Sequence, residues 1–181
     1  MMETRTIVRA ALFAALIAVL GLVPRIDVPI AAGVPITAQT LGVMLAGVLL
    51  GARVGAASVI LFLFVVALGA PFLSGGRGGI GVFFGPTAGY LIGWIFGAAA
   101  IGVLMQKLPV ASVFVRALFA SLIGGVVVIY LFGISYLAFA ARLGLEKAFI
   151  AGLVFLPGDI FKAVVSALVA QSYFASRAKM K

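Results

Sequence analysis

The chain of 181 residues contains no cysteine and no histidine, and it has only four acidic side chains. Without cysteine there is no disulfide, no thiolate metal site and no thiol nucleophile. Without histidine the chain also lacks the commonest transition-metal ligand and the usual general base. We therefore expect no metal site and no cofactor, and few side chains remain for enzymatic chemistry.

Charged residues of both signs are scarce as well, at 9% of the chain, whereas hydrophobic residues make up 65%. A soluble domain carries about 25% charged residues, so this chain cannot cover a water-facing surface. Apolar runs fill nearly all of it and leave no room for a separate soluble domain. The composition predicts an all-α, polytopic membrane protein in which residues 1–181 form a single domain.

The formal net charge of +9 would suggest nucleic-acid binding in a soluble protein. Here the basic residues stand singly between apolar segments, without a basic stripe that alternates with aromatic side chains. Membrane topology explains them better, and we expect no nucleic-acid partner.

A membrane-spanning helix needs roughly 17–25 mostly apolar residues. Proline, glycine and charged residues divide the chain into six candidate segments, which predicts one bundle of six transmembrane helices. The segments are Thr6–Val23, Thr37–Leu50, Val54–Ala70, Pro86–Met105, Val113–Ala141 and Ala148–Phe174. The first resembles a signal peptide that follows Arg5 and Arg9, but we expect it to stay attached because the rest of the chain is equally apolar.

Lysine and arginine are more frequent in cytoplasmic than in external loops, and this bias orients the predicted helices. With both termini in the cytoplasm, eight basic residues lie inside and four lie outside. The inner set is Arg5, Arg9, Arg53, Lys107, Arg116, Arg177, Lys179 and Lys181, and the outer set is Arg25, Arg77, Arg142 and Lys147. This orientation places the two long connections rich in glycine and proline outside, so we expect a ligand to arrive from the outer face.

Small residues recur at four-residue intervals along the first predicted helix, at Ala10, Ala14 and Ala18. Such a stripe lets another helix approach closely. It forms either an internal contact with helices of this chain or a docking surface for a partner membrane protein, and the sequence leaves both interpretations open.

The connection between the third and fourth segments contains SGGRGGIGVFFGPTAGY. It lacks the GxxxxGK[ST] pattern of a phosphate loop, so we do not expect a nucleotide site. Glycines such as Gly76 and Gly78 permit close backbone approach, which suits a loop that folds over a cavity as a lid. In this interpretation Phe83 and Phe84 supply an apolar plug.

Polar side chains stand at the outer ends of two predicted helices. The second helix opens with Thr37, Gln39 and Thr40, and Thr37 either caps this helix or faces a ligand. The amide of Gln39 is more costly to leave unpaired in an apolar setting, which favours a ligand contact. Tyr90 lies one turn into the fourth helix, either as a ligand contact or as a residue of the interfacial aromatic belt.

The last predicted span holds the strongest signal, the motif LPGDIFKA. Within it Asp159 and Lys162 are three residues apart and share a helix face. Ionisable side chains within a span cost roughly 2.5–3.5 kcal/mol each on insertion scales, and they usually face a cavity. We favour a ligand site over the alternative, an internal ion pair that ties the last helix to the bundle.

Three stretches together resemble the BioY family, the biotin-specific substrate-binding (S) components of energy-coupling factor (ECF) transporters. The stretches are PITAQTLGVMLAGVLLGARVG, FFGPTAGYLIGW and LPGDIFKA. The resemblance implies biotin uptake across the bacterial cytoplasmic membrane. It also implies a transmembrane coupling subunit and two ATP-binding cassette ATPase subunits as partners, since no ATP-binding motif occurs in this chain.

The resemblance further implies roles for individual residues. The aspartate and lysine that contact biotin in the family match Asp159 and Lys162, and the tyrosine of GPTAGY matches Tyr90. The glycine loop supplies further polar contacts in the family, and this chain places Arg77 there. The alanine stripe of the first helix resembles the surface on which S components dock their coupling subunit.

The sequence leaves two other functions open. The chain could serve as the S component for another small vitamin, because the shared architecture leaves the choice of ligand to the pocket residues. An intramembrane enzyme that uses Asp159 as an acid or base is the third possibility. The lack of histidine, of cysteine and of a second intramembrane carboxylate argues against an enzyme.

Overall fold

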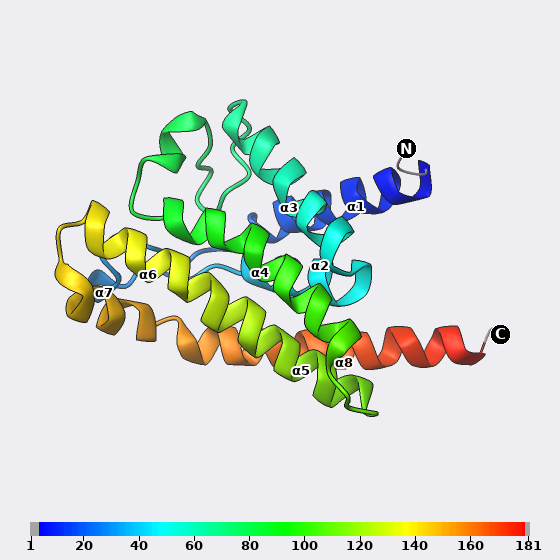
Figure 1. The fold of residues 1–181 in the computed structure, drawn as a ribbon. Coiled ribbons are helices and arrows are strands. Elements are labelled where there is room, and N and C mark those ends of the chain that lie inside the picture. Colours follow the sequence, from blue (N-terminus) through cyan, green and yellow to red (C-terminus); the bar gives the residue numbers. More distant parts are fainter. Residues whose placement is uncertain (1–3, 180–181) are drawn as a thin grey trace.

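The computed structural model describes residues 4–179, which form helices and loops with two isolated β-bridges but no β-strand (Figure 1). The α-helices are α1 (Thr4–Leu20), α2 (Gln39–Leu50), α3 (Ala52–Ala67), α4 (Ala88–Lys107), α5 (Val113–Leu122), α6 (Ile129–Ala140), α7 (Gly144–Leu153) and α8 (Leu156–Lys179). Three further elements are the 3₁₀-helices η1 (Pro29–Ala31) and η2 (Ile80–Phe83) and the π-helix η3 (Ile123–Val128).

The first four predicted spans correspond to α1, α2, α3 and α4, with every boundary within three residues of the expected one. Not all of these helices are long. Two helical stretches in residues 4–179 are long and apolar enough to cross a membrane, namely Ala88–Lys107 and Val113–Ala140. The bent pair of α7 and α8 passes the same criterion as a third.

The fifth predicted span is one continuous helical stretch of 28 residues made of α5, η3 and α6. Its middle section, η3, is a π-helix with the sequence IGGVVV. A π-helical turn holds an extra residue, so it shifts the rotational phase of the helix that follows it. The side chains of α6 therefore face different neighbours from those that a regular helix would give them.

The prediction of a single sixth span was wrong in one respect, because this stretch is two helices. The axes of α7 and α8 differ by 50° at a short break. Pro157 and Gly158 lie just inside the start of α8, where a missing N–H costs nothing. Pro157 thus starts a new helix, and it places Asp159 in the first turn of α8.

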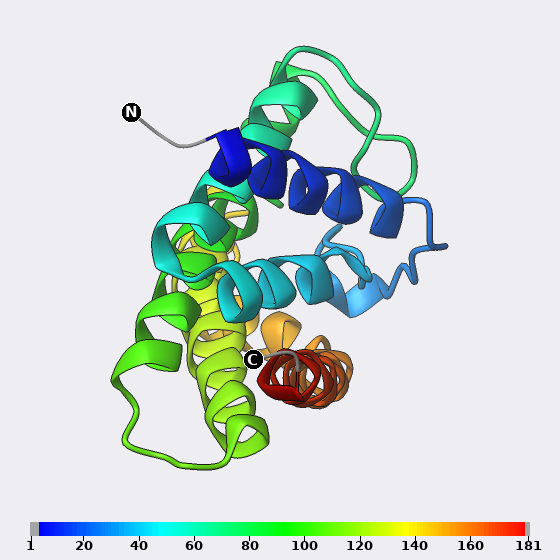
Figure 2. The same ribbon diagram turned by 90° about the vertical axis from the view of Figure 1, so that its right-hand side faces the viewer.

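Helix α4 lies at the centre of the bundle and packs against α2, α3, α5, α6 and η3 (Figures 1 and 2). Its contact with α6 and η3 depends on Gly89, Gly93 and Gly97, which recur at four-residue intervals. A Cβ atom on any of the three would meet a carbonyl oxygen of the facing helix at 2.6–3.0 Å. Helix α8 runs along α5 and α2, and the two ends of the described chain lie at the same end of the bundle (Figure 1).

The alanine stripe of α1 lies inside the protein, so the expectation that it docks a partner is wrong for Ala10 and Ala14. Their exposed fractions are 5% and 8%, and Ala18 is partly buried. The cause is the packing of α1 on α3 and α2, which covers this face of the helix. The neighbouring residues Ala11 and Ala15, also four apart, are exposed.

We expect Ala14→Leu to destabilise the isolated protein, because extra methylene groups in a packed interface cost about 1–3 kcal/mol. Ala15→Leu is the matched control, since it adds the same volume at an exposed position of the same helix. Thermal unfolding of both variants in detergent measures the difference. Equal melting temperatures would show that α1 does not pack through Ala14.

Candidate ligand-binding site

A cavity opens at the end of the bundle away from the termini, with about 560 Å³ of empty space including its opening. Helices α2, α4, α6 and α8 line it together with the two long loops. The lining residues are Val34, Pro35, Ile36, Thr37, Gln39, Thr40, Leu73, Arg77, Thr87, Tyr90, Leu91, Trp94, Ile129, Tyr130, Phe155, Asp159 and Lys162. The cavity thus gathers every predicted ligand-binding residue.

The carboxylate of Asp159 is the centre of a polar network in this cavity. Its Oδ1 accepts hydrogen bonds from Lys162 Nζ at 2.8 Å and from Thr40 Oγ1 at 3.0 Å. Its Oδ2 accepts one from Tyr130 Oη at 2.8 Å. Lys162 Nζ also donates to Thr40 Oγ1 at 2.9 Å, so donors from three helices converge on one carboxylate.

The carboxylate of Asp159 lies inside the protein, next to an opposite charge. Only 4% of the residue is exposed, and a buried carboxylate is tolerated when it is paired and hydrogen-bonded. Lys162 supplies the opposite charge, and the first turn of α8 supplies the positive end of a helix dipole. Asp159 and Lys162 thus form the ion pair that the sequence offered as the alternative to a ligand site, and both side chains also line the cavity.

The network keeps unused hydrogen-bonding capacity that faces the cavity. An ammonium has three N–H donors, and Lys162 uses two of them on Thr40 and Asp159. Asp159 Oδ2 has a single partner among the described residues, and the hydroxyl oxygen of Tyr130 can still accept. A ligand with both donors and an acceptor could use these positions together.

Sequence reasoning missed Tyr130 and gave Thr40 no role in binding. Tyr130 lies in the apolar run VVVIYLFG, which suggests that it only packs in the core. It reaches Asp159 because it comes two residues after η3, whose extra residue sets the phase of α6. A tyrosine within an apolar span was the only signal that could have identified it.

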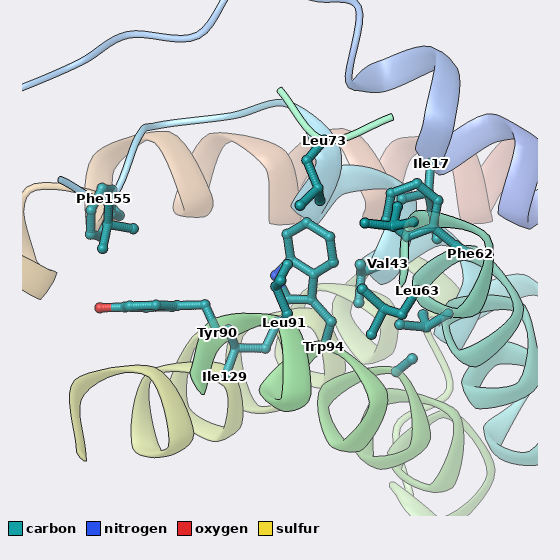
Figure 3. Packing of buried hydrophobic residues seen from close by; sticks show 14 of the residues in the cluster. Ile17, Val43, Phe62, Leu63, Leu73, Tyr90, Leu91, Trp94, Ile129 and Phe155 are labelled. Atoms are coloured by element: carbon teal, nitrogen blue, oxygen red, sulfur yellow. The ribbon is translucent and has the colours of Figure 1, made fainter. Parts of the chain in front are cut away.

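Tyr90 lies in the first turn of α4 and lines the cavity. The ring meets Phe155 edge-on at 5.9 Å between centroids and extends beneath it (Figure 3). The hydroxyl group is buried and has no hydrogen-bond partner within residues 4–179. A buried hydroxyl without a partner is costly in an apolar setting.

The other side of the cavity is apolar. The indole of Trp94 lies beneath Leu73, with Leu91 and Ile129 close by (Figure 3). Leu73 comes from the loop between α3 and α4, yet only 2% of it is exposed. This wall suits a hydrophobic ring system or alkyl chain.

Gln39 holds the structure together and has no hydrogen-bonding position left for a ligand, which corrects its predicted role. Its Nε2 donates to the carbonyl oxygens of Ile17 at 3.1 Å and Phe72 at 3.0 Å. Its Oε1 accepts from the backbone N and the Oγ of Ser74, at 3.1 and 3.3 Å. The side chain thereby joins the start of α2 to the end of α1 and to the α3–α4 loop.

Thr37 does not cap α2. The residue before the helix is Ala38, and no side chain makes a cap hydrogen bond there. Thr37 is partly buried and lines the cavity, so of its two predicted roles a ligand contact is the one that remains.

The predicted lid between α3 and α4 takes a different form from the one expected. Phe84 is 76% exposed and points away from the cavity, while Phe83 is partly buried and packs against the core. Leu73 fills the place that the two phenylalanines were expected to occupy. The backbones of Leu73 and Arg77 pair around a tight turn in which Gly75 and Gly76 have φ values of 81° and 69°.

Glycine is required at both predicted lid positions. Gly76 adopts the left-handed conformation that other residues avoid. Gly78 lies against the carbonyl oxygen of Ala70, which leaves no space for a side chain.

Arg77 reaches the cavity from this turn. Its Nε donates to the carbonyl oxygen of Ser74 at 3.3 Å. Burial lowers the pKa of Arg77 from its usual value, nearby Arg25 lowers the pKa further, and Asp27 partly opposes both effects. The guanidinium is therefore a cation in surroundings that disfavour its charge.

A match to a protein-family model shows which known proteins this chain is related to. The family model described as "BioY family" matches residues 1–179. The chain belongs to the BioY family. Among curated relatives, the biotin transporter BioY of Rhizobium etli is 52% identical over 183 aligned residues, which cover 94% of each chain.

Another curated relative and a solved structure support the membership of this chain in the BioY family. The biotin transporter BioY of Rhodobacter capsulatus is 43% identical, over 93% of this BioY-family chain and 92% of that protein. A crystal structure of the S component for biotin from an ECF-type ABC transporter superposes with a TM-score of 0.87 at 34% identity. That match covers 97% of this chain and 95% of the solved one.

We expect Gln39→Leu to release the α3–α4 loop, because it removes four hydrogen bonds without changing the size of the side chain greatly. Hydrogen–deuterium exchange should then become faster at the amides of Ser74 and its neighbours in the loop. Thr37→Val is the matched control, since it removes a polar group from the same cavity without touching the loop. Unchanged exchange in Gln39→Leu would show that Leu73 alone holds the loop.

Proposed function

We propose that this chain captures biotin as the S component of an ECF-type transporter. The observation that carries the proposal is the Asp159 network, which leaves donors and acceptors free beside an apolar wall in the cavity. The fold that holds this cavity matches that of the solved S component for biotin. Its relatives are transporters, and the chain is not an enzyme.

The unused positions of the network match the ureido group of biotin. This group presents two N–H donors and one carbonyl acceptor. The third N–H of Lys162 can donate to the carbonyl oxygen, while Asp159 Oδ2 and the hydroxyl oxygen of Tyr130 can accept from the two N–H groups. The fused rings of biotin then lie against the apolar wall around Trp94.

We expect Asp159→Asn to weaken biotin binding roughly tenfold to a hundredfold, because hydrogen bonds to charged groups contribute about 1.5–3 kcal/mol. Lys162→Met should weaken it too, partly by leaving Asp159 unpaired in an apolar setting. Calorimetric titration of purified protein measures both affinities. Glu146→Gln is the control, since it changes an exposed acidic residue at the same end of the bundle, and it should bind biotin as the unmodified protein does.

The double variant Asp159→Leu/Lys162→Met separates binding from structure. Two apolar residues can replace a purely structural ion pair without loss of stability. A folded double variant that binds biotin with unchanged affinity would show that the ion pair has only a structural role. A folded variant that binds poorly supports the ligand contact.

We further infer a single domain of six membrane-spanning units in the bacterial cytoplasmic membrane. The units are α1, α2, α3, α4, the continuous stretch from α5 to α6, and the bent pair of α7 and α8. The distribution of lysine and arginine favours cytoplasmic termini, with the cavity near the outer face.

Cysteines introduced into this cysteine-free chain test the orientation. We expect Glu146→Cys to react with a membrane-impermeant reagent in intact cells and Lys107→Cys to react only after permeabilisation, because the two exposed positions lie on opposite sides. The reverse labelling pattern would move the cavity to the cytoplasmic side.

The proposed partners are a transmembrane coupling subunit and two ATPase subunits. With Ala10 and Ala14 buried, the exposed pair Ala11 and Ala15 is the small-residue surface of α1 that remains for close helix contact. The predicted docking surface therefore remains on α1 but is shifted by one residue, from Ala10 and Ala14 to Ala11 and Ala15.

Ala15→Leu tests the docking surface in the assembled transporter. We expect the variant to bind biotin normally as an isolated protein but to transport it more slowly with its partners, because a bulky side chain prevents close helix approach. Uptake of labelled biotin measures the effect, and Ala140→Leu, which adds the same volume at an exposed position of α6, serves as the control. Full uptake by Ala15→Leu would contradict docking through this surface.

A further inference from the structure

A second cavity lies at the end of the bundle that carries both termini, the end that faces the viewer in Figure 2. It has about 740 Å³ of empty space including its opening, and none of its lining residues belongs to the ligand cavity. Its walls come from the ends of α2 and α4, the start of α5 and the last turns of α8. Most of the lining is apolar, and its polar side chains are Gln106 and Arg116.

Arg116, in the first turn of α5, turns its guanidinium into the protein. Its Nε is buried and has no hydrogen-bond partner among residues 4–179. Its Nη1 donates to the carbonyl oxygen of Met105 at 3.5 Å, which is beyond the usual length of such a bond. An arginine that served only to set the membrane topology would extend its charged group into water. The guanidinium of Arg116 instead directs unused N–H donors into the cavity wall.

Positive charge at this end has no counterpart among the described residues. The carboxylates of residues 4–179 are Asp27, Glu146 and Asp159, and all three lie toward the ligand cavity. The end that carries the termini holds Arg5, Arg9, Arg53, Lys107, Arg116 and Arg177. A cation that is partly removed from water is stabilised by an anion beside it. An anionic molecule bound in the cavity would therefore pair with Arg116.

The level of Arg116 in the membrane indicates which anions can reach it. The stretch from α5 to α6 has 28 residues. At about 1.5 Å per residue it is roughly 42 Å long, whereas the hydrocarbon core of a bilayer is about 30 Å thick. Each end thus extends roughly 6 Å beyond the core, and Arg116 lies about 4.5 Å from the start of the stretch. This is the level of the lipid phosphates.

The lining favours a lipid over a soluble anion. A free phosphate ion is strongly hydrated and needs polar partners on several sides, whereas this cavity presents Leu49, Val113 and Phe174 beside its polar groups. A phospholipid carries a phosphate next to apolar chains, so it can satisfy both kinds of wall. Basic pockets between transmembrane helices are known to hold anionic headgroups.

We propose that this cavity binds the headgroup of an anionic phospholipid from the adjoining leaflet, with its phosphate on Arg116. The amide of Gln106 lies beside Gly51 and can donate to the same headgroup. Helix α3 begins directly after Gly51 without a capping side chain, so the positive end of its dipole adds to the attraction. A lipid bound there contacts the ends of α2, α4, α5 and α8 together.

Matched short-chain lipids test the inference on the full-length protein after removal of its native lipids in detergent. The probes are dioctanoyl phosphatidylglycerol, which is anionic, and dioctanoyl phosphatidylcholine, which has the same chains but no net charge. We expect the unmodified protein to bind the anionic lipid at least about fivefold more tightly, measured by native mass spectrometry. Arg116→Gln should reduce this ratio to within about twofold.

Control variants separate the cavity from the general positive charge of this end. Lys107→Gln removes one positive charge from an exposed position of the same end and should leave the ratio unchanged. Arg116→Lys keeps the charge without the planar group and should retain part of the preference. Val113→Phe narrows the cavity without changing its charge and should also weaken the anionic lipid. Biotin titration of each variant checks that the distant ligand cavity is still folded.

Several outcomes would overturn the inference. Equal affinity of the unmodified protein for the two lipids would exclude an anion-selective site. An equal loss of preference in Arg116→Gln and Lys107→Gln would assign the effect to surface charge alone. Stabilisation by inorganic phosphate that depends on Arg116 and matches that of the lipid would assign the cavity to a soluble anion. Loss of assembly with a coupling subunit in Arg116→Gln, with an unchanged lipid ratio, would assign Arg116 to a protein partner.

Discussion

The buried carboxylate of Asp159 imposes the strictest requirement on the structure. A charge in an apolar interior is tolerated only with an opposite charge and several hydrogen bonds. Thr40, Tyr130 and Lys162 meet this requirement from α2, α6 and α8. Any displacement of one of these helices would leave the carboxylate partly unpaired, so a single group fixes the relative positions of three helices around the cavity.

Two breaks in regular helical structure make this arrangement possible. Pro157 starts α8 after a 50° bend and so brings Asp159 to a helix N-terminus. The π-helical segment η3 sets the phase of α6 and so brings Tyr130 to the carboxylate. Irregular backbone in the bundle is therefore concentrated where it serves the cavity.

Apolar run length predicted most of the helices, and the motif PGDxxK placed Asp159 and Lys162 on one face of the last span, because both signals are local. Contacts between distant segments were harder to predict. The alanines of α1 occur at two overlapping four-residue spacings, and only tertiary packing decides that Ala14 is buried and Ala15 exposed. Gln39 is polar in an apolar region, yet its partners Ile17 and Ser74 lie in other segments of the chain.

The same limit explains the mistaken lid residues. Together with Phe72, Phe83 and Phe84 are the largest apolar side chains of their loop, but hydrophobicity does not determine which of them faces inward. The direction of each side chain depends on the turn from Leu73 to Arg77 and on the hydrogen bonds that Gln39 makes to the adjoining backbone. Those features place Leu73 over the cavity and Phe84 on the outside.

The π-helical segment has a consequence for how such proteins change over evolutionary time. It lies between two separate packed cores, one around the cavity that includes Ile129 and one at the other end that includes Ala117 and Ala163. Because the extra residue offsets the phase of α6 from that of α5, one continuous helical stretch presents a different face to each core. A substitution in α6 at the cavity therefore lies away from the packing of α5 on α8, so the ligand preference can change with little effect on that packing.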